Sequence, residues 1–171
     1  YPDWKVDDYP AQYINFDSVG VRQAWEKNGQ NTAKDMHDEK GNMPFFQWAK
    51  SDIIANFDSI NPEYFKSLDK KMEYLNNNGF VVFLETVRRD HGPSWKKYFD
   101  WPESFARYVQ YIIARYGAYN IIFSGIHLDW INRDFCLPAN EFNEALTYHY
   151  NKYGGLPYNQ PHTLLIDGST Y

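Results

Sequence analysis

Three stretches of the chain each combine a helical hydrophobic pattern with a short apolar run that follows it. The first covers residues 62–84, and its helical part has apolar residues at spacings of four, four and three: Tyr64, Leu68, Met72 and Leu75. Asn61 before Pro62 predicts the helix start, and Gly79 predicts its end. Residues 80–84 are apolar at every position, which is typical of a parallel strand buried under helices.

The second stretch repeats this order of helix and strand. Asp100 and Glu103, on either side of Pro102, predict a capping box that opens a helix. The apolar face of this predicted helix holds Phe105, Val109, Ile112, Ile113 and Tyr116. Gly117 predicts the helix end, and residues 121–123 predict the next strand.

The third stretch begins at Asn140, which predicts a helix start, and continues to a predicted strand at residues 163–166. The glycine pair at 154–155 predicts the end of its helix. Upstream, residues 17–27 predict a weaker helix and residues 32–36 a strand. The chain therefore reads as about four helix–strand units, with no linker rich in proline, glycine or serine between them.

Alternation of helices and buried strands predicts an α/β fold with a parallel sheet and right-handed crossovers. A doubly wound nucleotide-binding sheet is disfavoured, because the chain contains neither GxGxxG nor GxxxxGK[ST]. A complete (β/α)8 barrel typically needs about 250 residues and eight strands. We therefore expect residues 1–171 to form one domain that is a partial (β/α)8 TIM barrel, roughly the N-terminal half, as a fragment of a longer chain.

The aromatic content changes this picture most, since 6 Trp, 15 Tyr and 12 Phe make up 19% of the 171 residues. Aromatic faces line sugar-binding clefts, where the C–H faces of a pyranose stack on them. The alternative is that these rings fill the core and its rim. Over the whole chain, the excess favours a carbohydrate cleft.

Charge and composition exclude several other functions. The net charge of −5 argues against binding to nucleic acid, which needs clustered positive charge. No apolar run approaches the ~20 residues of a membrane span. The single cysteine, Cys136, excludes an internal disulfide and a cysteine-based zinc site. The N-terminal residues Tyr-Pro-Asp-Trp do not resemble a signal peptide, so we expect a mature chain or an excerpt.

Acidic residues follow three of the predicted strands, where a barrel carries its chemistry. Glu85 follows the strand predicted at residues 80–84, Asp129 lies just past the one at 121–123, and Asp167 follows the one at 163–166. Glycoside hydrolysis needs two carboxyl groups that flank the scissile bond, which favours Asp129, beside Trp130 and after a predicted Gly-containing turn, as the general acid/base. The alternatives are helix capping, pairing with arginine and, for Asp167, a turn with Gly168.

Several neighbours of these acids are candidate substrate contacts. Arg88 and Arg89 can hold a carboxylate or sulfate of an acidic polysaccharide through bidentate contacts, or form an ion-pair cluster with Glu85 and Asp90. His127 can bind a sugar hydroxyl or make a structural hydrogen bond. Three tryptophans in strand-end loops can stack on sugar rings or pack in the interior: Trp95, Trp101 and Trp130.

A metal is not expected. His127 and Asp129 have the spacing of half a metal site, but no third ligand lies at a suitable spacing. We therefore expect no metal.

Several short segments occur in the order in which the apiosidase-like group of clan-A glycoside hydrolases has them. The chain resembles this group over roughly residues 20–130, at residues 41–45 (Gly-Asn-Met-Pro-Phe), 61–65 (Asn-Pro-Glu-Tyr-Phe), 68–69 (Leu-Asp), 78–80 (Asn-Gly-Phe), 115–117 (Arg-Tyr-Gly) and 120–123 (Asn-Ile-Ile-Phe). The resemblance implies a (β/α)8 barrel and carbohydrate hydrolysis without a required cofactor. It also implies an acid after the fourth strand, at Asp129, and a second acid after the seventh strand, beyond Tyr171. Family members commonly have a stretch of small residues before the first of these acids, whereas this chain has Ser-Gly-Ile-His-Leu at 124–128.

We therefore expect a secreted or periplasmic glycoside hydrolase that acts on a plant or algal polysaccharide or oligosaccharide, including acidic or sulfated ones. Asp129 is the expected general acid/base, and the expected substrate contacts are Glu85, Arg88, His127, Trp95, Trp130 and Asp167. The expected partners are the sugar substrate and the remaining half of the barrel, with no nucleic acid and no membrane. The alternative is a non-catalytic carbohydrate-binding barrel module.

Overall fold

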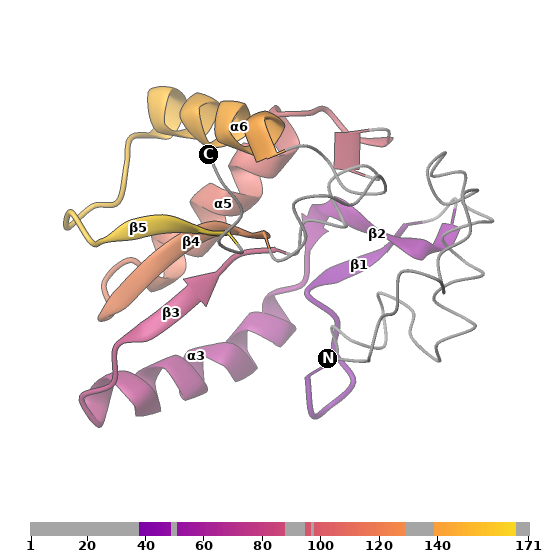
Figure 1. Cartoon of the computed structure of the whole chain (residues 1–171). Helices are drawn as coiled ribbons and strands as arrows, with labels where there is room; N and C mark the ends of the chain where they lie inside the picture. The colour runs from indigo at the N-terminus through magenta and orange to yellow at the C-terminus, as the bar shows by residue number, and fades with distance from the viewer. Residues whose placement is uncertain (1–37, 49–50, 88–94, 97, 129–138, 167–171) are drawn as a thin grey trace, which may run out of the picture. The chain divides into compact units, whose positions relative to one another are not determined.

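Figure 1 shows the computed structural model of the protein, which describes residues 38–48, 51–87, 95–96, 98–128 and 139–166. The helix predicted at residues 17–27 and the strand predicted at 32–36 lie outside the described residues. The chain divides into two compact units, Tyr1–Phe65 and Lys66–Tyr171, which we describe separately.

The first unit contains an antiparallel pair of strands, β1 (Phe45–Trp48) and β2 (Ser51–Ile60). Phe45 and Phe57 are buried, and their ring centroids lie 5.2 Å apart in edge-to-face contact. Only residues 49–50 separate the two strands, which suits an antiparallel hairpin and leaves no room for a crossover helix. The predicted strict alternation of helices and strands is therefore wrong in this part of the chain.

The second unit is built on a parallel sheet with the strand order β3–β4–β5. Its strands are β3 (Val82–Glu85), β4 (Ile121–Leu128) and β5 (His162–Ile166). Helix α3 (Pro62–Asn77) precedes β3, and the connecting helices are α5 (Glu103–Tyr116) and α6 (Ala139–Tyr153). The predicted order and the parallel pairing are confirmed, while the described strands form no closed barrel.

The start of α3 is the one that the sequence predicts. The Asn61 side-chain oxygen accepts the backbone N–H of Glu63 at 3.1 Å, and Gly79, with φ of 78°, follows the helix end. Asn140 does not precede its helix as predicted, since α6 begins at Ala139.

The capping box predicted for α5 is wrong. No side chain caps this helix, and the backbone N–H of Ser104 donates to the backbone carbonyl of Asp100 at 2.6 Å. The Glu103 carboxylate instead accepts a hydrogen bond from Lys152 of α6 at 2.6 Å. The local pattern assigns Glu103 to the helix cap, but its side chain instead bonds to Lys152, which is distant in the sequence.

The interior of the second unit lies where α5 and α6 pack on each other and on the sheet (Figure 1). All five residues predicted for the inner face of α5 are buried: Phe105, Val109, Ile112, Ile113 and Tyr116. On α6 the buried residues are Phe142, Ala145, Leu146 and His149. Because burial of one large apolar side chain contributes about 1.5–3 kcal/mol, these two faces account for much of the stability of this unit.

Strand β3 is covered on one face only. Leu84 is buried, but Phe80, Val81 and Phe83 expose 55%, 63% and 43% of their surface. The prediction that residues 80–84 form a buried strand is therefore wrong for Phe80, Val81 and Phe83 in the described structure. Leu84 lies on the face of the sheet that packs against α5 and α6, and Phe83 lies on the opposite face.

Strand β4 is longer than predicted. Residues 124–128, expected to form a permissive turn before Asp129, continue the strand to Leu128. A Cβ at position 125 would collide with the side chain of Leu146, so Gly125 serves the close approach of α6 to the sheet. The glycine is needed for packing here, and the prediction of a turn is wrong.

Candidate functional site

Three polar residues from three adjacent strands share one register position, which is the last residue of β3, the middle of β4 and the second residue of β5. Glu85 of β3 is paired with Ser124 of β4, and Ser124 is paired with Thr163 of β5. Paired residues of parallel strands point to the same face of the sheet. We call Glu85, Ser124 and Thr163 the polar row.

The polar row faces away from α5 and α6. The neighbouring pair, Leu84 and Phe123, is buried, and Phe123 is paired with His162, whose ring lies 5.8 Å from that of Tyr150 in α6. Because side chains alternate along a strand, the polar row occupies the opposite face. Within the row, Thr163 is exposed, Glu85 is partly exposed and Ser124 is fully buried.

The same face carries apolar residues one step toward the amino ends of the strands. Phe83 is paired with Ile122 there. The face therefore has an apolar layer followed, in the direction of the carboxyl ends of the strands, by a polar one. Parallel α/β sheets bind their ligands beyond those carboxyl ends.

Three of the predicted site residues stand directly at strand ends in the chain. Glu85 is the last residue of β3, Asp129 follows Leu128 at the end of β4, and Asp167 follows Ile166 at the end of β5. The structure of Asp129 and Asp167, and that of Arg88 and Trp130, lies outside the described residues. The backbone of His127 belongs to β4 and is paired with Leu165.

Trp95 lies in the interior of the second unit. Its side chain is fully buried, its indole N–H donates to the Ser104 hydroxyl at 2.7 Å, and its ring centroid lies 5.4 Å from that of Phe105 and 5.6 Å from that of Tyr108. These contacts match the alternative that Trp95 packs in the interior. Trp95 is therefore not among the proposed substrate contacts.

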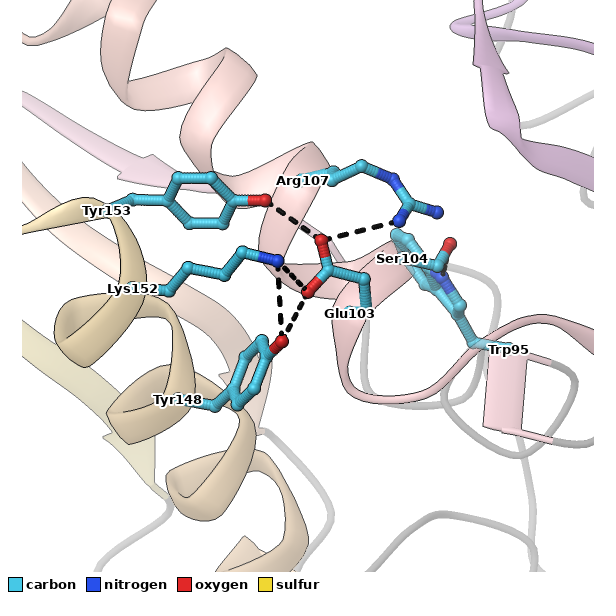
Figure 2. A network of polar contacts seen from close by, with 7 residues as sticks. All are labelled: Trp95, Glu103, Ser104, Arg107, Tyr148, Lys152 and Tyr153. Atoms are coloured by element: carbon cyan, nitrogen blue, oxygen red, sulfur yellow. Dashed lines mark hydrogen bonds and ion pairs between the residues drawn. The ribbon is translucent and has the colours of Figure 1, made fainter.

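A second polar cluster, which was not predicted from the sequence, joins α5 to α6 (Figure 2). The Glu103 carboxylate accepts hydrogen bonds from Lys152 at 2.6 Å, from Tyr153 at 2.9 Å and from Tyr148, and lies 3.4 Å from the Arg107 guanidinium. These partners are four residues away on the same helix or 45–50 residues away on α6, so only the ion pair with Arg107 has a local sequence signal.

The hydrogen-bond partners of Glu103 determine the protonation state of its carboxyl group. Hydrogen bonds, above all that from Lys152, lower the pKa of the Glu103 carboxyl to about 2. The hydrogen bond to Glu103 in turn raises the pKa of Lys152. Near neutral pH this carboxylate is ionised and holds no proton to donate, so the cluster connects the helices and does not supply a general acid.

An ion pair connects two of the segments that carry the family resemblance. The Arg115 guanidinium donates to both carboxylate oxygens of Asp69, at 2.6 and 2.5 Å. These hydrogen bonds raise the pKa of Arg115. Segments 68–69 and 115–117 therefore meet to hold α3 against α5, which is a structural role.

The described residues contain no group of three or more His, Cys, Asp or Glu side chains that could hold a metal ion. Among the helices of the described part, none is long and apolar enough to cross a membrane.

A parallel α/β sheet with acids at the carboxyl ends of its strands is an arrangement that glycoside hydrolases use. The family model described as "Apiosidase-like, catalytic domain" matches residues 19–151, which is more than half of the chain. The chain belongs to this family, which indicates a glycoside hydrolase and confirms the resemblance found in the sequence. Neither a curated protein nor a solved structure matches the chain.

Proposed function

We propose that the protein is a glycoside hydrolase that cleaves plant or algal polysaccharides or oligosaccharides with a pair of carboxyl groups. In this proposal residues 1–171 contribute roughly the N-terminal half of a (β/α)8 barrel. Asp129 is the general acid/base, and in this proposal the second acid follows the seventh strand of the barrel. The protein acts in a secreted or periplasmic setting.

The observation that carries the proposal is the polar row together with the chain order beyond it. Glu85 ends β3 on the face opposite α5 and α6, in register with Ser124 of the neighbouring strand β4, and β4 continues through Leu128 to Asp129. Two adjacent parallel strands are therefore each followed or ended by an acidic residue at the carboxyl end, where barrels carry their chemistry. The proposed substrate contacts are Glu85, Arg88, His127, Trp130 and Asp167.

The proposed substrates include acidic or sulfated polysaccharides. The support is the adjacent pair Arg88 and Arg89, three residues after the end of β3. Guanidinium groups bind carboxylate and sulfate oxygens through two parallel hydrogen bonds.

The experiment is a hydrolysis assay on neutral and acidic plant and algal polysaccharides, with the intact enzyme that contains this segment and with residues 1–171 alone. We expect reducing ends to appear only with the intact enzyme, because residues 1–171 supply one acid of the pair. Turnover by monomeric 1–171 would contradict the partial barrel. Tight sugar binding without any turnover by the intact protein would favour a non-catalytic binding module instead.

A further inference from the structure

A bulge interrupts the pairing of β4 with β5 just before the chain reaches Asp129. Ser124 is paired with Thr163, whereas His127 is paired with Leu165. Two residues of β4, Gly125 and Ile126, therefore stand opposite one residue of β5. A bulge of this kind changes the alternation for the residues that follow, and bulges are frequent beside active sites because they redirect side chains.

Three consecutive carbonyl groups at the bulge have donors that are not part of the β4–β5 ladder. The Ser124 carbonyl accepts the backbone N–H of Thr86 at 3.1 Å, and the Gly125 carbonyl accepts the hydroxyl of the same Thr86. The Ile126 carbonyl accepts the Ser124 hydroxyl at 2.7 Å. Buried backbone carbonyls need hydrogen-bond donors. Where the β4–β5 pairing is irregular, the hydroxyl groups of Thr86 and Ser124 supply these donors.

A third hydroxyl holds Thr86 in place. Tyr108 of α5 donates its phenol O–H to the backbone carbonyl of Thr86 at 2.9 Å. Thr86, Ser124 and Tyr108 are all buried, at 9%, 0% and 5% exposure, so water does not compete for these hydrogen bonds. We call these three residues the bulge cluster.

We propose that the bulge cluster is a set of positioning residues, which fixes the bulge in β4 and thereby the direction in which the chain enters Asp129. The proposal rests on the proposed function, because it concerns the placement of its general acid/base. Thr86 joins β3 to β4, and Tyr108 ties both to α5, so three elements set one backbone position. Misplacement of a catalytic group by about 1 Å can cost on the order of 10²-fold in rate.

The test compares Thr86→Val, which keeps the shape but removes the hydroxyl, with Thr86→Ser, which keeps the hydroxyl. In the intact enzyme we expect Thr86→Val to lower kcat about 10²-fold with KM little changed, and to shift the acidic limb of the kcat–pH profile. Thr86→Ser is expected to restore most of kcat and the wild-type profile. Equal kcat values and pH profiles for the two variants would overturn the proposal.

Ser124→Ala is the second variant, since it removes a single oxygen atom and remains informative where Thr86→Val does not fold. We expect the same loss of kcat with KM retained. Tyr153→Phe is the control, because it also removes one hydroxyl from a hydrogen bond, a partly buried one, but touches Glu103 and not β4. A loss of kcat as large in Tyr153→Phe as in Ser124→Ala would contradict a specific positioning role.

Amide hydrogen exchange separates this proposal from the proposed function. We expect faster exchange within residues 121–128 in Thr86→Val than in Thr86→Ser and the wild type. If the intact wild type hydrolyses no glycoside but this exchange pattern holds, the proposed function fails while the bulge cluster stands as a structural device. If the wild type is active and the exchange of the two variants is the same, the bulge cluster fails alone.

Discussion

Arg115 of α5 donates to both carboxylate oxygens of Asp69 in α3, and this fork-shaped ion pair joins two segments that carry the family resemblance. The Asp69 side chain is 37% exposed, so solvent screens part of the attraction. We expect Asp69→Asn to reduce the free energy of unfolding by about 1 kcal/mol, because one strong charge-assisted pair is lost. Urea denaturation measures this loss, and Glu144→Gln on the exposed side of α6 is the control. An equal, near-zero effect of both changes would show that the ion pair contributes nothing.

We expect Glu103 to make the stability of the fold depend on pH in the acidic range. Its folded-state pKa is lowered from 4.5 to about 2, chiefly by Lys152. A lowered carboxyl pKa gives stability that is present above the unfolded pKa and is lost as the pH falls through the folded one. We expect Glu103→Gln to be less stable than the wild type at pH 7 and the difference to shrink between pH 4.5 and about 2. A difference that is constant over this window would contradict the assignment.

We expect His149 to make the stability of the fold depend on pH closer to neutrality. The ring is fully buried, its Nε2 lies 3.0 Å from the Gln110 side-chain oxygen, and no hydrogen-bond partner for Nδ1 occurs in the described structure. Burial lowers the pKa of His149 below 6.5. The unfolded chain therefore binds a proton more readily, so stability falls as the pH drops below about 6.5.

His149→Leu tests this assignment. We expect the variant to lose the part of the decline in the free energy of unfolding that begins below about pH 6.5, while the decline due to Glu103 remains at lower pH. Urea denaturation across pH 5–8 measures the difference. The same slope in the wild type and the variant would show that His149 does not titrate differently in the folded and unfolded states.

The elements that the sequence predicts well are those with local causes. The start of α3 depends on Asn61 and Glu63, which lie two residues apart, and the inner face of α5 follows from a helical repeat. The failures have distant causes. Glu103 pairs with residues 45–50 positions away, and position 125 of β4 needs a glycine because Leu146 packs on it.

The candidate site was also predictable from the sequence only in part. Glu85 could be placed at a strand end from the apolar run before it. Ser124, Thr163 and Thr86 could not be selected, because their significance depends on the register between strands and on a one-residue bulge. A register of this kind results from packing across the whole sheet and leaves no signal in a single segment.

Arg88 and Arg89 give a prediction about substrate charge. The double variant Arg88→Ala/Arg89→Ala is expected to weaken binding to a charged polysaccharide far more than binding to its neutral analogue. Added salt should act like the double variant, since exposed charge contacts are screened within about 8 Å at physiological ionic strength. Calorimetric titration of both ligands measures the effect, and equal losses on both would assign the two arginines to structure.

The central claim is that Asp129 is the general acid, and the leaving-group dependence of Asp129→Asn in the intact enzyme tests it most directly. The amide keeps the size of the side chain but cannot donate the proton that a sugar leaving group needs. We predict that kcat on the natural substrate falls by about 10²–10⁴-fold while an activated aryl glycoside, whose leaving group needs little protonation, loses much less. Glu85→Gln is the control. If Glu85→Gln gives this pattern while Asp129→Asn retains wild-type kcat on both substrates, the acid lies on β3 and the assignment is wrong.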